Sequence, residues 1–314
     1  MNIDELVLKY ATLMPARFKR KQKLLFINEI SREYQSLGFE VKAVQSVRKG
    51  VKAINLLIGD LKNAKTLIVT NYDTPQRNYG RSLDYFPLNG SITFVNSLLA
   101  YYTPLLIGSV FSLFIIIVGM PKVDFTNNFW QSLIIVSSFI LAFLFSTLLT
   151  FGVGNKFNYN RNSSGVIGSL LIADKLKNRK DVAYILTDMG CMNKAGDRMV
   201  VDALPKTLKD KHVILLDCLG YGARIGIGYR AKAKTKSEEL LKYYNDDNIF
   251  FTELDETDLK YSSANYYEKC TVVSYGKKQN GSFIVQNTSS IDDIEIDNEA
   301  IERISEGIVR FIKK

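Results

Sequence analysis

Polar side chains that could do chemistry gather in three short clusters, each directly after a predicted strand. The clusters are 71–74 (Asn-Tyr-Asp-Thr), 187–191 (Thr-Asp-Met-Gly-Cys) and 217–218 (Asp-Cys). A fourth polar run, 160–165 (Asn-Arg-Asn-Ser-Ser-Gly), opens a predicted helix. In open α/β sheets, ligands bind beyond the carboxyl ends of the strands. We therefore expect the four segments to meet at one edge of a sheet and to form a site there.

Two carboxylates and one thiol are the candidates for catalysis. Asp73 and Asp217 could act as a general acid–base pair, and Cys191 could act as a nucleophile. A nucleophilic cysteine needs a nearby base and a lowered pKa. The sole histidine, His212, begins a predicted strand and lies in none of the clusters. We therefore expect Cys191 to be a buried, inert thiol.

Buried strands that alternate with helices would position these clusters. Strands are predicted at 39–47, 53–58, 66–70, 182–186, 213–216, 271–275 and 283–285, and helices at 19–37, 164–176, 235–244 and 298–312. This alternation is typical of a mostly parallel sheet that is covered on both faces. The predicted fold class is therefore α/β, a three-layer α/β/α arrangement around a mostly parallel, mixed sheet.

Two long apolar runs interrupt this pattern. Residues 85–121 and 125–155 contain no Asp, Glu, Lys or Arg, and each run exceeds the roughly 20 residues that cross a bilayer. A buried core helix is the alternative, but such helices are shorter and carry a polar face. We predict a transmembrane hairpin at 89–155, with helices at about 91–120 and 127–152. Residues 1–88 and 156–314 would then form one discontinuous domain.

Charge around the hairpin predicts its orientation. Arg77, Arg81, Lys156 and Arg161 flank it on the domain side, whereas Lys122 stands alone at the tip. The positive-inside rule then places the domain and both termini in the cytoplasm, in a two-pass protein of the cell membrane. The first ten residues are polar and acidic, unlike a signal peptide, and three cysteines suit a reducing compartment.

The net charge of +9 comes from dispersed short groups such as the basic run at 17–21. No nucleic-acid-binding motif accompanies these groups, so we expect no nucleic-acid partner. Attraction to anionic lipid headgroups is the simpler interpretation.

Six segments, in order along the soluble part of the chain, carry a family resemblance. They are the Pro-Ala-Arg opening at 15–17 with its helix, LIVTNYDTP, YNRNSSGVIGSLLIADKL, VAYILTDMGCMNKAGD, VILLDCLGY and QNTSSIDDIEIDNEAI. Together they resemble the di-zinc aminopeptidase family, whose clan also holds the glutaminyl cyclases and the transferrin receptor. The resemblance implies a zinc-exopeptidase-like fold and locates the positions of the family's metal site.

The resemblance implies that most of the metal-site positions hold other residues here. The family binds two zinc ions through two His, a bridging Asp, a Glu and a further Asp. Of the ligand positions only Asp217 matches, and Asp73 matches the Asp that orients the first His. The remaining ligand positions hold Asn71, Arg161, Cys191 and Asn287, and the general-base position holds Gly190. We therefore expect no metal and no other cofactor.

Loss of two divalent cations has to be balanced by other charges. Arg161, at the bridging position, could supply a guanidinium, which pairs carboxylates in a fork geometry. We expect it to point into the former metal site and to bind Asp217 or Asp73. A solvated loop arginine near lipid headgroups is the alternative. For Asn71 and Asn287 we expect hydrogen bonds to neighbouring loops.

Small residues recur at four-residue spacing in both apolar runs, at Gly108 and Ser112 and at Ser138, Ala142 and Ser146. Such stripes let membrane helices approach closely. Packing within the hairpin and contact with a further protein both remain open. Pro104 permits a kink, which would separate an interfacial helix at 91–100.

These observations predict a catalytically inactive, aminopeptidase-like membrane protein. It would serve as an accessory or scaffold subunit of an integral membrane complex, with a transporter or an export machine as candidates. The family offers a precedent, since the transferrin receptor and nicastrin are inactive members that act through protein contacts. Two alternatives remain, namely a membrane-bound peptidase or amide hydrolase with non-standard chemistry, and a peptide-binding module that retains the substrate pocket. The expected partners are an integral membrane protein that docks on the hairpin, anionic lipid headgroups and, in the second alternative, a peptide.

Overall fold

The computed structural model describes residues 1–48, 50–78, 83–119, 129–191, 193–244 and 248–314. The predicted hairpin tip at 121–128, together with Lys122 and the flanking Arg81, lies outside these residues.

A mixed sheet forms the centre of the domain. Within the described residues it has nine strands, in the order β1-β2-β4-β3-β5-β8-β6-β7, and β9 pairs with β8. The strands are β1 (Val41–Arg48), β2 (Val51–Ile58), β3 (Thr66–Asn71), β4 (Val182–Thr187), β5 (His212–Leu216), β6 (Arg224–Tyr229), β7 (Phe250–Glu253), β8 (Cys270–Gln279) and β9 (Ser282–Ile284). The four central strands β4, β3, β5 and β8 are parallel, whereas β2 and β6 join them antiparallel.

Helices cover both faces of this sheet. The helices of the domain are α1 (Ile3–Val7), α2 (Arg20–Ser36), α5 (Ser164–Leu176), α6 (Ala195–Ala203), α7 (Pro205–Leu208), α8 (Lys234–Leu241), α9 (Glu256–Leu259) and α10 (Asn298–Lys313). Side chains alternate along each strand, so Ile68 packs in the core with α2, α5 and α10, while Leu67 and Val69 pack with α6 and α7. The result is a three-layer α/β/α domain, which confirms the predicted fold class.

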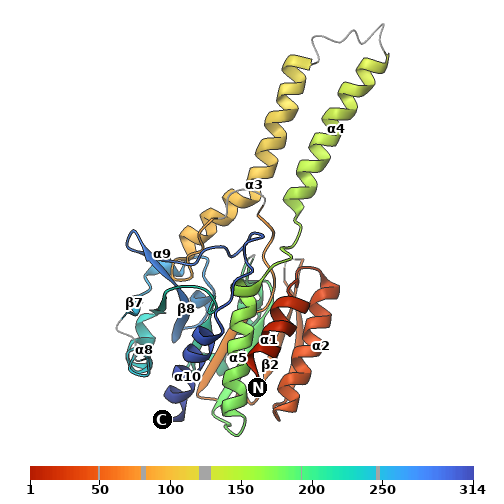
Figure 1. Cartoon of the computed structure of the whole chain (residues 1–314). Coiled ribbons are helices and arrows are strands. Elements are labelled where there is room, and N and C mark those ends of the chain that lie inside the picture. Colours follow the sequence, from red (N-terminus) through yellow and green to blue (C-terminus); the bar gives the residue numbers. More distant parts are fainter. Residues whose placement is uncertain (49, 79–82, 120–128, 192, 245–247) are drawn as a thin grey trace.

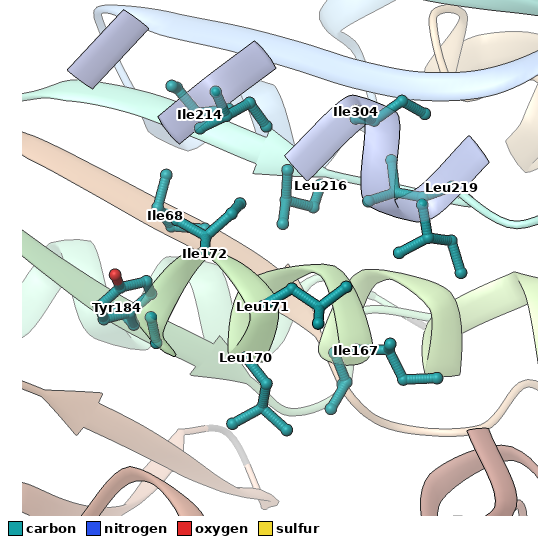
Figure 2. Close-up of a cluster of buried hydrophobic side chains, with 14 of the residues drawn as sticks. Ile68, Ile167, Leu170, Leu171, Ile172, Tyr184, Ile214, Leu216, Leu219 and Ile304 are labelled. Carbon is teal, nitrogen blue, oxygen red and sulfur yellow. The ribbon is translucent and has the colours of Figure 1, made fainter. Parts of the chain in front are cut away.

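Helix α5 lies at the centre of the larger core. Its side chains Ile167, Leu170, Leu171 and Ile172 lie over the sheet, among Ile68 of β3, Tyr184 of β4 and Leu216 of β5 (Figure 2). All residues of this helix from Ser164 to Ala173 are buried. A helix that is apolar on all sides suits this enclosed position, since α2 and α10 cover its outer surface.

Two apolar helices project from the domain (Figure 1). They are α3 (Gly90–Phe114), continued by the π-helical turn Ile115–Gly119, and α4 (Phe129–Phe151). Each is long and apolar enough to span a membrane, and only 11% and 6% of their apolar windows are buried. They are therefore not core helices of the domain. Figure 1 shows α3 bent along its length, and Pro104 lies inside this helix.

The small residues bring the two helices together. Gly108 and Ser112 on α3 and Ser146 on α4 are buried, although most of their neighbours are exposed. A Cβ atom added to Gly108 would lie 1.6 Å from the Ser146 hydroxyl. These members of the stripes are therefore used for packing within the hairpin. Two polar side chains of α3 also bond the chain locally, since Asn96 donates to the Asp84 carbonyl and Thr103 to the Leu99 carbonyl.

The chain enters and leaves the hairpin at neighbouring points of the domain. Gln76 forms a β-bridge with Gly154, and the Arg77 amide donates to the Val153 carbonyl at 2.8 Å. Tyr85 and Val285 exchange two backbone hydrogen bonds of 2.8 Å. At the start of α3, Asn89 donates to Asp258 at 2.7 Å, and the Phe94 ring stacks on Tyr261 with centroids 3.9 Å apart. The hairpin is thus fastened to the domain along both connections.

Candidate functional site

The site is built at the carboxyl ends of three parallel strands. Asp73 follows β3, Asp188 follows β4 and Asp217 follows β5, and the strand pairings bring these ends together. The turn Tyr159–Ser163, which opens α5, approaches from the adjacent layer. The four segments expected to meet therefore do meet at one edge of the sheet.

Arg161 and Asp217 form a buried ion pair at the centre of the site. The guanidinium Nη1 lies 2.6 Å from Asp217 Oδ1, and the two side chains are 5% and 8% exposed. Burial alone would lower the pKa of Arg161, but the neighbouring Asp217 opposes this effect, and the pKa lies well above its usual range. Arg161 therefore stays charged. Arg161 points into the site and is not a solvated loop residue.

Tyr85, which precedes the hairpin, closes this pair from the side. Its hydroxyl donates to Asp217 Oδ2, the oxygen that Arg161 does not bind. Its ring lies under the guanidinium, with the Arg161 Cζ atom 3.5 Å from the ring centroid. Burial is the largest effect on the Tyr85 phenol and helps to raise its pKa well above 10. The hydroxyl is therefore protonated and serves as a donor, which the carboxylate needs.

Asp73 is held by the backbone of the next cluster. Its carboxylate accepts from the amides of Gly190 at 2.7 Å and Cys191 at 3.1 Å. Burial raises the pKa of Asp73 to about 6, and the Asp188 carboxylate adds to this, while the Lys23 ammonium opposes it. Lys23 itself pairs with Asp188. Asp73 thus braces the Gly190–Cys191 turn and does not bind Arg161 directly.

Asn71 and Gly190 lie against each other and leave no space for a longer side chain. A Cβ atom at position 190 would lie 2.1 Å from the Asn71 amide carbon. Asn71 accepts from the Thr187 hydroxyl at 2.6 Å and contacts the Ser263 hydroxyl at 3.4 Å. It therefore bonds its neighbours, as expected. A general base at position 190 does not fit this arrangement.

Cys191 is a neutral thiol. Its sulfur accepts from the Asn162 amide at 3.0 Å, and burial, together with the Asp73 charge, raises its pKa to about 12. His212 begins β5 and so lies at the opposite edge of the sheet from Asp217, which follows that strand. Burial lowers the pKa of His212 to about 4, and its Nε2 pairs with the Thr271 hydroxyl at 2.9 Å. The histidine cannot activate the cysteine.

Asn287 differs from expectation. It lies on the loop between β9 and α10, is half-buried and adopts a left-handed backbone conformation with φ of 60°. Its side chain makes no hydrogen bond to the described part of the chain. The expected bracing of a loop by Asn287 is therefore wrong, because the backbone of this loop is held instead by Asn155, which donates to the Ser290 carbonyl at 2.7 Å.

The site contains more buried charges than the sequence predicted. Among the described residues, and apart from His212, there are four buried cations and five buried carboxylates. They are Arg17, Lys23, Arg161 and Lys194, and Asp73, Asp188, Asp197, Asp217 and Asp293. Arg17 donates to the carbonyls of Tyr10, Met14 and Tyr72 and to the Ser163 hydroxyl. Asp293 accepts from the amides of Asn160 and Arg161, and burial raises its pKa to about 7. The cluster is close to neutral without an added ion.

Little space remains beside these charges. The cavity next to Asp217 is lined by Tyr85, Thr93, Lys194 and Ser263, among others, and has a volume of about 10 Å³. That volume corresponds to roughly one water molecule. In the part of the chain that the structure describes, no three His, Cys, Asp or Glu side chains lie close enough together to hold a metal ion. Among the described residues, Tyr85 before the hairpin and Thr93 within it thus line the small cavity beside Asp217.

Comparisons with known proteins agree with this fold. No family model matches the chain, and no curated protein matches it by sequence. Among solved structures, the Porphyromonas gingivalis glutaminyl cyclase is similar, with a TM-score of 0.59, 12% identity and coverage of 99% of this chain and 95% of that one. A Zn-dependent exopeptidase from Parabacteroides distasonis is also similar, with a TM-score of 0.59 and 12% identity; the match covers 99% of this chain and 94% of that one. The Legionella pneumophila LapA aminopeptidase has a TM-score of 0.56 and 10% identity, and the match covers 99% of this chain and 70% of that one. The chain therefore has the fold of zinc exopeptidases and glutaminyl cyclases.

Proposed function

We propose that this protein is a catalytically inactive, membrane-anchored relative of the zinc aminopeptidases that works as an accessory or scaffold subunit. The observation that carries the proposal is the buried Arg161–Asp217 pair, closed by Tyr85. By the resemblance above, Arg161 stands at the bridging ligand position. A guanidinium there repels a divalent cation and satisfies the carboxylate that would bind it.

The surrounding residues support the same conclusion. Position 190 cannot hold a general base beside Asn71, and the Cys191 thiol is neutral at physiological pH. A peptidase or amide hydrolase with other chemistry would need an accessible acid or base. Asp73 is instead enclosed and bonded to two amides. The cavity that the described residues form beside Asp217 has a volume of only about 10 Å³, which also argues against a peptide bound at that point.

Membrane anchoring is the second part of the proposal. It rests on the two projecting apolar helices and on the basic residues next to their ends. The partner would be an integral membrane protein that contacts the exposed faces of the hairpin, within a complex such as a transporter or an export machine. Because Gly108 and Ser146 already pack against each other, the outward side chains of α3 and α4 are the surfaces available to that partner.

Elemental analysis of the purified full-length protein tests the central claim. We expect no stoichiometric zinc and no release of an N-terminal residue from aminoacyl substrates. About one or two zinc ions per chain, retained after dialysis against a weak chelator, would overturn the proposal.

Cross-linking in native membranes, followed by gentle detergent extraction, tests the role as a subunit. We expect a complex with another membrane protein. A monomer under every condition would leave the hairpin as an anchor only and would contradict the scaffold role.

A further inference from the structure

We propose that one surface of the domain, next to the exit of α4, binds the headgroups of anionic lipids. This surface, called the basic rim here, consists of the exposed side chains of Lys19, Arg20, Lys21 and Lys156, together with Leu13 and Phe157. The inference rests on the membrane anchoring proposed above and identifies where the domain would meet the bilayer.

Two chain segments that are distant in sequence build the basic rim. The Phe18 ring contacts Gly152, where a Cβ atom would come within 3.1 Å of it, and Phe18 also covers Gly154. Further along, the Asn158 amide donates to the Pro15 carbonyl at 3.3 Å, and the Tyr159 hydroxyl lies 2.9 Å from that of Thr12. Segments 12–18 and 152–159 therefore run side by side in opposite directions.

These contacts fix the height of the basic rim relative to a membrane. Helix α4 is apolar to its end at Phe151, and Phe18 contacts Gly152, the next residue. If this end of α4 lies at the membrane surface, as the proposed anchoring implies, the contact lies in the headgroup layer of the bilayer. Lys19, Arg20 and Lys21 follow Phe18 directly, and Lys156 follows Gly154. If α4 spans the membrane, these cations lie among lipid phosphates.

The charges of the basic rim are not used within the described part of the protein. None of its four cations forms an ion pair there. By contrast, two cations near the far end of α5 are paired, since Lys175 contacts Glu306 at 2.8 Å and Arg179 contacts Asp181 at 2.6 Å. Each unpaired cation beside a bilayer that contains anionic lipids raises the affinity of the protein for that surface about fivefold.

Exposed apolar side chains accompany these cations. Leu13 is 70% exposed and Phe157 is 37% exposed, although both lie on well-packed segments. Apolar side chains set among lysines and arginines are typical of surfaces that lie in the headgroup region. A free anion would use the cations alone and gives no reason for Leu13 and Phe157, which favours a lipid surface as the occupant.

Fluorescence quenching in nanodiscs tests this inference. A fluorophore is attached to Leu25→Cys, on the first turns of α2, and to Lys177→Cys at the opposite end of the domain, each in a Cys191→Ala background. The discs contain lipids with spin-labelled headgroups, with or without phosphatidylglycerol. We expect quenching at Leu25→Cys to increase about twofold or more with phosphatidylglycerol, and quenching at Lys177→Cys to stay unchanged.

Charge reversal provides the matched control. The variant Lys19→Glu, Arg20→Glu, Lys21→Glu should lose the increase. The variant Lys62→Glu, Lys206→Glu, Lys209→Glu reverses the same charge on exposed residues near the other ends of the parallel strands and should keep it. Equal quenching with and without phosphatidylglycerol, or an increase that survives reversal of the basic rim, would overturn the inference alone. Release of the protein from native membranes by alkaline carbonate would instead overturn the anchoring and the basic rim with it.

Discussion

Tyr85 donates its hydroxyl hydrogen bond to the Asp217 carboxylate, 132 residues further along the chain. Tyr85 lies shortly before the hairpin of α3 and α4, while Asp217 directly follows the central strand β5. A single side chain thus connects the root of the hairpin to the ionic centre of the fold. The candidate site and the hairpin therefore form one continuous structure.

Arg161→Ala should destabilise the domain strongly, because it leaves the Asp217 carboxylate buried and unpaired. Removal of one partner from a buried ion pair costs about 3–5 kcal/mol. Chemical denaturation in detergent, followed by circular dichroism, measures the change. Arg32→Ala is the control, since Arg32 is 74% exposed in its pair with Glu29 and should contribute about 0–1 kcal/mol. Equal effects of the two substitutions would contradict the prediction.

Tyr85→Phe removes one hydroxyl and keeps the ring under the guanidinium. We expect a loss of about 1–3 kcal/mol in the free energy of unfolding, because the charged carboxylate loses a buried donor. Tyr184→Phe is a matched control. Its hydroxyl is also buried but has no hydrogen-bond partner in the described part of the chain, so the substitution should cost nothing measurable. If Tyr184→Phe proved the more damaging, the role assigned to the Tyr85 hydroxyl would be wrong.

Asp293→Asn should change the pH dependence of stability. Burial raises the pKa of Asp293 to about 7, above that of an unfolded aspartate near 4. Between these two values the folded state binds the proton and the unfolded state does not, so stability falls as the pH rises from about 4 to about 7. The variant carries no such proton. The difference in melting temperature between the variant and the wild type should therefore shift in favour of the variant as the pH increases, and a constant difference across this range would count against it.

Gly108→Leu should force α3 and α4 apart, since even a Cβ atom would overlap the Ser146 hydroxyl. The expected result is a lower melting temperature in detergent and a lower yield of folded protein. Val110→Leu tests the same helix at a position that is 60% exposed and should have little effect. An identical response of both variants would show that the two helices do not rely on this contact.

The orientation in the membrane can be tested by cysteine labelling. A cysteine placed at Asn127, in the predicted tip, should react with an impermeant thiol reagent in intact cells. The native Cys270 cannot report the location of the domain, because it is fully buried and would stay unreactive on either side of the membrane. Lys177→Cys is exposed on the domain and should react only after lysis. The reverse pattern would place the domain outside the cell.

Much of the fold could be predicted because its central strands are short apolar runs. β3, β4 and β5 follow this rule, and all residues of β4 and β5 are buried. β6 was not predicted, since its sequence RIGIGY contains two glycines, which weaken a strand signal. The structure supplies the reason. A Cβ atom at Gly226 would lie 2.5 Å from the Phe283 ring, and one at Gly228 would lie 2.7 Å from Leu88. Such packing depends on distant residues and leaves no local pattern.

The candidate site likewise has a part that the sequence predicts and a part that it does not. The meeting of the strand ends follows from the parallel sheet, and the Arg161–Asp217 pair follows from charge balance. Tyr85 was counted as part of an apolar run, and Lys23 as part of a helix, because their roles depend on contacts more than 130 residues away. Ser263 and Lys194 likewise reach the site from separate loops.

The four buried cations have a consequence for the cell. In a metalloprotein, the charge of the centre depends on an external supply, and the fold weakens when that supply fails. Here lysine and arginine side chains provide the positive charge, so the centre is complete as soon as the chain has folded. If the protein binds no zinc, as we propose, starvation for zinc would leave it intact, although the same shortage empties the sites of zinc-dependent enzymes. The abundance of the protein would then not depend on the supply of zinc.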